Sequence, residues 1–244
     1  WKPASYASFT ENIKNGRKQQ FIMLFMILTV SLGMYHATVA RTILQNAKDN
    51  ASYLSGADVI IKEVWSDNSA FAEKGIEVEF QYYEPDYGKY ATLEGAKSYT
   101  KVIKDTAAKL TGKDDQKITL LGINTKEFGE NTYVQDRLLE KYYYEYLNDL
   151  ADAADGVLVS RNFQTKLGYK VGDKISFSDA DGNTAYGRIV DFVDYWPAYE
   201  PVLTEITPDG TVQKSEHYMV IAHYAALEQN WGVIPYEVWI TLEE

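Results

Sequence analysis

The side chains in this sequence that are best suited to chemistry are few, and their spacing does not bring them together. There is no cysteine, and the three histidines are His36, His217 and His223. A zinc site needs three or four converging ligands. His217 and His223 flank a predicted strand without sharing a face, and His36 falls in an apolar stretch. These residues therefore predict neither a thiol nucleophile nor a metal centre.

Two short runs have part of a functional pattern. Asp179 to Asn183 (DADGN) resembles the start of an EF-hand loop, but Val190 stands where that loop has its glutamate. Ser160 lacks the flanking glycines of a nucleophile elbow. We interpret the first run as a hairpin turn and Ser160 as the cap of the following helix.

Nucleotide-binding and dinucleotide-binding motifs are also absent from the sequence. Among 35 acidic residues some pairs will lie close together by chance, so composition alone cannot indicate a glycosidase. We therefore expect no enzymatic activity, no cofactor and no bound metal.

The stretch that organises the chain is residues 21–40, which contains no Asp, Glu, Lys or Arg. As a helix it would be about 30 Å long, which matches the hydrocarbon core of a bilayer. A signal peptide is an alternative, because residues 37–40 imitate a cleavage site. However, helical character continues into residues 41–44 without a break. A buried core helix is disfavoured because no polar face recurs. We expect a transmembrane helix.

The charge on either side of this stretch predicts its orientation. Residues 1–20 have a net charge of +3, and residues 41–244 hold 20 basic and 34 acidic side chains, a net charge of −14. The positive-inside rule then places the N-terminus in the cytoplasm and the acidic part outside the cell membrane. A sequence pI of about 4.8 argues against nucleic acid and anionic lipid as partners.

These observations divide the chain into four parts. Residues 1–20 form a cytoplasmic amphipathic segment, with a disordered tail as the alternative; residues 21–40 span the membrane; residues 41–55 form a stalk helix; and residues 56–244 form the extracytoplasmic domain. Along the stalk, apolar residues at a 4-3-4-3 spacing form a heptad seam. The members of this stalk seam are Ala40, Leu44, Ala47, Ala51 and Leu54. The seam is either an interface with another helix or a face that lies on the chain's own domain.

The patterning of the outer part predicts an α+β domain. Strands are expected at 57–65, 76–83, 117–123, 156–159, 174–177, 186–193, 202–206, 212–214, 218–222 and 236–241. Residues 98–110 have the propensity of a helix, but the turn at 112–115 and the strand that follows it favour a β-hairpin.

A turn of helix and a loop are expected at 125–132, helices at 138–150 and 224–231, and a short helix after Ser160. Gly56 is expected to end the stalk helix, and Asp181-Gly182 and Asp209-Gly210 to turn two hairpins. The helix at 138–150 has a tyrosine-rich inner stripe, which we interpret as core packing. The stripe consists of Leu139, Tyr142, Tyr143, Tyr146, Leu147 and Leu150. Gly168, Gly172 and Asp173 form a structural turn that needs a permissive backbone.

Residues 156–197 include the runs GVLVSRNFQTKLGYKVGDKISF and GRIVDFVDYWP. This part resembles the outer domain of FtsX-like permeases, the membrane subunits of MacB-type ABC transporters. The shared pattern is a strand, a small helix, Gly168-x-x-x-Gly172-Asp173 and a hairpin that ends in FVDYWP. The basic lead with the apolar helix is similar to the family's first transmembrane helix, and LSGADVIIKEVW, ITLLGINTKEF and YEVWITL are similar to further segments.

The resemblance implies a MacB periplasmic-core type of fold and a role as part of an ABC transporter permease subunit. It implies further transmembrane helices beyond Glu244, a separate ATP-binding subunit and a second permease copy as a candidate partner. The outer domain would relay or sense ATP-driven conformational change for export or for regulation of an envelope process. The alternative is the extracytoplasmic sensor domain of a membrane receptor or histidine kinase.

Overall fold

The computed structural model describes residues 3–112, 116–132, 134, 138–207 and 209–243. The chain forms two compact units, Trp1–Ala51 and Ser52–Glu244. The first two residues of the predicted segment 1–20 lie outside the described residues, as do residues 113–115 of the turn predicted before the strand at 117–123.

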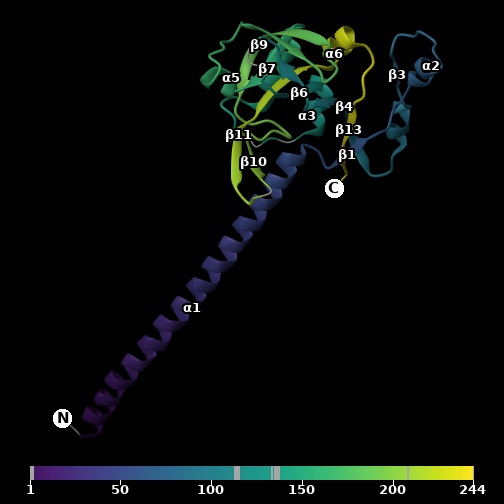
Figure 1. Ribbon diagram of the computed structural model, residues 1–244. Helices are drawn as coiled ribbons and strands as arrows, with labels where there is room; N and C mark the ends of the chain where they lie inside the picture. Colours follow the sequence, from purple (N-terminus) through teal and green to yellow (C-terminus); the bar gives the residue numbers. More distant parts are fainter. Residues whose placement is uncertain (1–2, 113–115, 133, 135–137, 208, 244) are drawn as a thin grey trace. The chain divides into compact units, whose positions relative to one another are not determined.

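The first unit consists of most of α1 (Pro3–Ser55), which runs as a continuous helix (Figure 1). Between Lys18 and Ser55 it contains a stretch long and apolar enough to cross a membrane, with a mean hydropathy of 1.8 and no part of it buried. The Thr29 and Thr38 hydroxyls inside this stretch donate to the carbonyls four residues earlier, at 2.7 and 2.8 Å. Polar groups satisfied within the helix are what a lipid environment requires.

The second unit is built on one nine-stranded mixed sheet. In spatial order its strands are β1 (Val59–Lys62), β13 (Glu237–Leu242), β4 (Ala96–Asp105), β6 (Ile118–Ile123), β12 (Tyr218–His223), β7 (Gly156–Ser160), β9 (Thr184–Val193), β8 (Lys174–Ser178) and β5 (Lys109–Leu110). The pairs β6–β12 and β7–β9 are parallel, and the other pairs are antiparallel. A long apolar helix followed by a mixed domain confirms the predicted α+β class.

Helices cover both faces of this sheet. On one face α3 (Thr125–Asn131) and α4 (Tyr143–Ala151) contribute to one apolar cluster. On the other face α5 (Asn162–Thr165) and α6 (Tyr224–Trp231) contribute to a second cluster. Along β7, Val157 and Val159 belong to the second cluster and Leu158 to the first. The central strands have continuous apolar runs because both of their faces are buried.

Two smaller elements lie outside the main sheet (Figure 1). The hairpin of β10 (Val202–Ile206) and β11 (Val212–Glu216) turns at Asp209 and Gly210, as predicted. An insertion contains β2 (Ser66–Asp67), α2 (Ser69–Glu73), β3 (Tyr82–Tyr83) and the 3-10 helix η1 (Tyr87–Thr92).

The insertion is attached to the sheet by a charged and aromatic cluster around Lys101 of β4. The Lys101 ammonium contacts the Glu84 carboxylate at 2.5 Å and lies 4.5 and 4.7 Å from the ring centres of Tyr87 and Tyr236. The Tyr236 hydroxyl donates to Glu84 at 2.7 Å. The ion pair and the cation–π attraction act on the same ammonium. Lys101 therefore holds both Glu84 and Tyr87 of the insertion to the sheet.

The strand predicted at residues 76–83 is wrong except for its last two residues, which form β3. Ile76, Val78 and Phe80 alternate as a strand would, but all three are exposed and no described strand pairs with this segment. Alternation supplies an apolar face, whereas a strand also needs a neighbouring backbone to bond to. The strand predicted at 57–65 is present over the shorter range of β1.

The helix predicted at residues 138–150 begins five residues late, at Tyr143. Tyr142, which we placed on the inner stripe, is 52% exposed and precedes the helix. Leu139 also precedes the helix and is only partly buried, whereas the other four members of the stripe are buried in the core. These are Tyr143, Tyr146, Leu147 and Leu150. The interpretation of the tyrosines as core packing is therefore confirmed for Tyr143 and Tyr146. The hairpins, the strand assignment of residues 98–105 and the helix at 224–231 are also confirmed.

Among the glycines with the left-handed backbone that other residues rarely adopt, Gly56 and Gly172 have different surroundings. Gly56 follows α1 with φ of +83°, and Gly172 lies in the turn before β8 with φ of +92°. A Cβ added at Gly172 would meet open space, whereas one at Gly56 would lie 2.6 Å from the Trp239 ring. The two positions therefore share a backbone constraint and differ in packing.

We expect Gly172→Ala to lower the free energy of unfolding by about 1–2 kcal/mol through backbone strain alone. Gly56→Ala should lower it by a further ~1–3 kcal/mol, because the Trp239 ring must move. Urea unfolding followed by tryptophan fluorescence measures both. Equal losses in the two variants would show that contact with Trp239 adds nothing at Gly56.

Candidate functional site

The last turn of α1 is bonded to the loop after β9 (residues 194–201) through Tyr53. The backbone N–H of Trp196 donates to the Tyr53 hydroxyl oxygen at 2.7 Å, and the N–H of Ala198 donates to the Tyr53 carbonyl at 2.9 Å. The Tyr53 ring lies edge-on to Tyr195, with 6.3 Å between the ring centres. Burial raises the pKa of the Tyr53 hydroxyl, so the group stays neutral. All of these residues belong to the second unit.

Directly after this turn the chain packs on the centre of the domain. Gly56 lies against the fully buried Trp239 of β13, and Trp239 in turn lies 5.5 Å from Phe128, measured between ring centres. Phe128 also stacks on Trp196, with an interplanar angle of 8°. We call the set Tyr53, Gly56, Trp196, Ala198 and Trp239 the Tyr53 anchor.

The loop that receives Tyr53 contains a strained residue. Ala198 has φ of +59° and is the single non-glycine residue with positive φ among the described residues. Left-handed backbone at a residue with a Cβ costs free energy and persists where the surroundings hold it. Here the Ala198 N–H bond to Tyr53 and the packing near Gly56 provide that restraint.

On its far side the same loop is fixed by His217, one of the two histidines considered as ligands. His217 Nδ1 lies 2.7 Å from the Glu200 carbonyl oxygen, and its Nε2 lies 2.7 Å from the Thr119 hydroxyl. Since a carbonyl only accepts, Nδ1 carries the proton and Nε2 accepts from Thr119. The Tyr199 hydroxyl donates to the His217 carbonyl at 2.9 Å. Both ring nitrogens are thus used in holding the loop to β12 and β6.

Burial lowers the pKa of His217, which keeps the imidazole neutral. The nearby Glu200 carboxylate opposes this shift, and Lys104 and Lys117 add to it. His223 lies apart, with Nε2 at 2.6 Å from the Leu150 carbonyl. The structure therefore does not bring the two histidines together. The part of the chain that it describes has no cluster of three His, Cys, Asp or Glu residues suited to a metal.

The predicted capping role of Ser160 is wrong. Ser160 is fully buried; its hydroxyl donates to the Asn162 side-chain oxygen at 2.6 Å and accepts from the Met219 N–H at 2.9 Å. The residue at the cap of α5 is Arg161, which makes no side-chain capping bond. Ser160 lies one position before the cap of α5, because β7 continues through it. Its hydroxyl therefore joins β7 to β12 instead.

Arg161 instead forms a bidentate pair with Asp194 at the start of the loop that receives Tyr53. Its Nε lies 3.1 Å and its Nη2 2.8 Å from the two Asp194 oxygens, and Glu140 approaches Nη2 at 2.7 Å. This pairing raises the pKa of Arg161 further above its usual range. The forked geometry fixes the direction in which the loop leaves β9.

The stalk seam lies on α1, and its five side chains are exposed. Leu44 is 71% exposed and Leu54 41% exposed. The assignment of the seam as an interface stays a prediction. Tyr53 was missed from the sequence because it lies outside this seam. The signal that could have pointed to it is the VDYWP run, whose aromatic residues had been given no role.

The predicted structural turn lies between α5 and β8. Gly168 and Gly172 both have positive φ, and the Asp173 carboxylate accepts from the Lys170 N–H at 2.8 Å. The Gly172 N–H donates to the Ile189 carbonyl of β9 at 2.8 Å. That these residues are purely structural stays a prediction.

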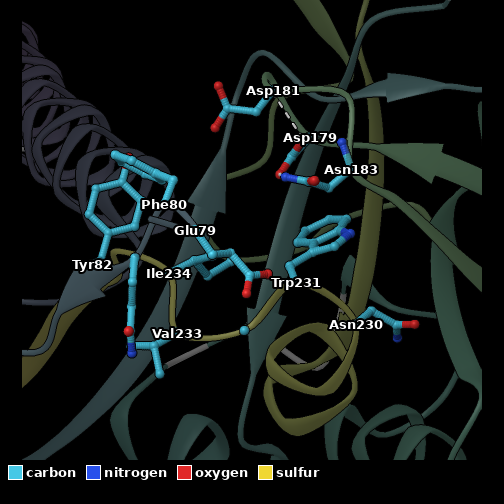
Figure 2. A pocket seen from close by; sticks show the side chains of 12 residues that line it. Glu79, Phe80, Tyr82, Asp179, Asp181, Asn183, Asn230, Trp231, Val233 and Ile234 are labelled. Atoms are coloured by element: carbon cyan, nitrogen blue, oxygen red, sulfur yellow. Dashed lines mark hydrogen bonds between the residues drawn. The ribbon is translucent and has the colours of Figure 1, made fainter. Parts of the chain in front are cut away.

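A cavity of about 910 Å³ lies elsewhere in the domain (Figure 2). Its walls come from residues 79–82 of the insertion, the β8–β9 turn and the end of α6 with the residues that follow it. The Asp179 carboxylate accepts from the N–H groups of Asp181 and Asn183 at 3.0 and 2.8 Å. The DADGN run is therefore a hairpin turn, and it lines this cavity.

Comparison with known proteins gives partial likenesses. No family model matches the chain, and no curated protein matches it. Among solved structures, the extracellular domain of the noncanonic ABC-type transporter YknZ from Gram-positive bacteria is 14% identical. That comparison covers 64% of this chain and 71% of the other, with a TM-score of 0.37.

Two further structures are similar at the same level. The periplasmic region of MacB from Actinobacillus actinomycetemcomitans is 10% identical, covering 65% of this chain and 64% of that one, with a TM-score of 0.35. A domain of a putative permease protein from Porphyromonas gingivalis is also 10% identical, covering 79% of this chain and 75% of that one, with a TM-score of 0.35. The structures that this chain resembles at this level are thus an extracellular domain of an ABC-type transporter, a periplasmic region of MacB and a domain of a putative permease.

Proposed function

We propose that this chain is the first transmembrane helix and extracytoplasmic domain of an FtsX-like ABC transporter permease subunit. In this proposal residues 21–40 cross the membrane with the N-terminus in the cytoplasm, and the domain passes on or senses ATP-driven change for export or for regulation of an envelope process. The observation that carries the proposal is the Tyr53 anchor, because it joins the last turn of a membrane-length apolar helix to the domain's central loop.

The anchor is suited to carrying a displacement. A continuous helix is stiff along its axis, and the two hydrogen bonds of Tyr53 make the loop follow the last turn. The loop continues from β9 and is fixed to β12 through His217 and Tyr199. A shift of the last turn of α1 would therefore reach the middle of the sheet and not only its edge.

The partners follow from the same proposal. A separate ATP-binding subunit would act through the rest of the permease, inside the membrane and cytoplasm. The stalk seam would be covered by a descending helix of the permease or by a second permease copy, since exposed apolar stripes in water favour a partner. The chain itself would have no catalytic role and would bind no nucleic acid.

The second candidate is the sensor domain of a membrane receptor or histidine kinase, which would also begin with one helix and a stalk. The sequence that follows Glu244 in the gene separates the two. A returning apolar helix followed by more spans supports the permease, whereas one span leading to a cytoplasmic signalling helix supports the receptor.

We expect protease added to intact cells to remove the domain, because the basic lead keeps the N-terminus inside and the acidic part outside. The measurement is an immunoblot with antibodies against the domain, and a cytoplasmic protein that stays intact serves as the control. Protection of the domain until the cells are lysed would overturn the proposed topology.

We expect Tyr53→Phe to lower the free energy of unfolding by about 1 kcal/mol, because the Trp196 N–H loses its acceptor. In the complete transporter the variant should also weaken the coupling between ATP hydrolysis and the transporter's output at a temperature where the domain is folded. Tyr186→Phe is the matched control, since the Tyr186 side chain is exposed on β9. Unchanged coupling in a measurably destabilised Tyr53→Phe variant would limit the anchor to a structural role.

We expect the anchor loop to loosen on acidification. Because the folded-state pKa of His217 lies below its unfolded value of about 6.5, the unfolded chain takes up this proton first, and stability falls as the pH drops below about 6.5. His217→Gln removes this titration but leaves the carboxylates. The free energy of unfolding of the wild type minus that of the variant should therefore become smaller as the pH falls from 7 to 5. A difference that does not change with pH would contradict the lowered pKa of His217.

A further inference from the structure

The cavity in Figure 2 has acidic side chains on two of its three walls. Glu79 comes from the insertion, and Asp179 and Asp181 come from the β8–β9 turn. In the described structure the carboxylates of Glu79 and Asp181 have no ion pair or hydrogen bond, and no lysine or arginine lines the cavity. Residues 41–244 carry a net charge of −14. The cavity therefore favours a positively charged occupant.

The remaining lining combines apolar and aromatic side chains with the amides of Gln81, Asn183 and Asn230. Phe80 and Tyr82 stand on the insertion side, with their ring centres 4.9 Å apart, and Trp231 ends α6 on the other side. Val233 and Ile234 follow it. Carboxylates beside aromatic rings suit a lysine or arginine side chain, whose head pairs with the charge while its stem covers apolar surface. The domain uses this combination itself where Lys101 meets Glu84, Tyr87 and Tyr236.

One wall of the cavity also has free backbone groups. Residues 76–80 belong to no strand, and within the described residues the N–H groups of positions 77–80 donate no hydrogen bond. The segment is held at its end by Asn68, whose side chain donates to the Glu79 carbonyl at 2.6 Å and accepts from the Gln81 N–H at 2.9 Å. An apolar–acidic alternation with unpaired backbone is a template for one more strand.

We propose that this cavity binds a basic peptide segment in extended conformation, which pairs its backbone with residues 77–80. Its lysine or arginine side chains lie against Glu79 and Asp181, with their stems over Trp231, and the residues between them lie on the Phe80 side of the segment. The inference goes beyond the proposed permease role, and it is tested on the chain alone, without an ATP-binding subunit.

The test is the binding of a fluorescent-labelled acetyl-Arg-Val-Arg-Val-Arg-amide probe to the full chain in neutral detergent micelles, followed by anisotropy. We expect binding that weakens as the salt concentration rises, because the pairing is partly between exposed charges. Glu79→Gln combined with Asp181→Asn should raise the Kd at least tenfold. The matched control, Glu145→Gln with Asp152→Asn, removes the same charge outside the cavity lining and should change the Kd less than twofold.

A second probe separates strand pairing from charge. The same peptide with N-methylated valines keeps its three positive charges but loses backbone donors and so should bind at least tenfold more weakly. Thermal unfolding of each variant shows whether the domain is intact. The inference is overturned if the first probe does not bind at millimolar concentration, if the control pair weakens binding as much as the cavity pair, or if N-methylation has no effect.

Discussion

The entry of the chain into this domain depends on the two hydrogen bonds that Tyr53 accepts, one at its hydroxyl and one at its carbonyl. They fix where the chain enters the domain, and Gly56 then turns it directly against Trp239. A side chain at position 56 would displace the Trp239 ring of β13, the strand with which β1 pairs. One small set of contacts therefore fixes both the last turn of α1 and the strand β1 at one edge of the sheet.

Tyrosine and tryptophan make many of the joins between elements that are distant in sequence. The Tyr90 hydroxyl donates to Glu63, the Tyr236 hydroxyl to Glu84, and the Tyr199 hydroxyl to the His217 carbonyl. Each ring buries apolar area while its polar end reaches a hydrogen-bond partner in another element. A domain without cysteine thus fixes its peripheral segments by packing and hydrogen bonding rather than by disulfides.

The acidic character of the outer part has consequences in two places. Some basic residues are shared between two carboxylates, as Arg161 is between Asp194 and Glu140. At the cavity beside Trp231 no basic residue lines the wall, and the acidic side chains there face a hollow space. Repulsion among like charges costs stability, so an unneutralised group at a concave site is a reason to look for a cationic partner.

The sequence alone determined the features that depend on local pattern. The uncharged length of residues 21–40 implied the apolar helix, Gly56 its end, and the Asp-Gly turns at 181–182 and 209–210 the two hairpins, because each rests on neighbouring residues. The tertiary structure decided where a pattern was compatible with more than one environment. Residues 76–80 alternate as a strand does, yet within the described part of the chain no strand pairs with them to complete a ladder.

The candidate site was beyond the reach of local pattern for the same reason. Tyr53 and Trp196 are 143 positions apart, and only the folded sheet brings the loop after β9 to the last turn of α1. Ser160 looked like a cap because caps are recognised from the next few residues, whereas its partner Met219 comes from another strand. Hydrogen bonds between distant segments leave no periodic trace in the sequence, so the helix, the turns and the fold class could be predicted while the anchor and the cavity could not.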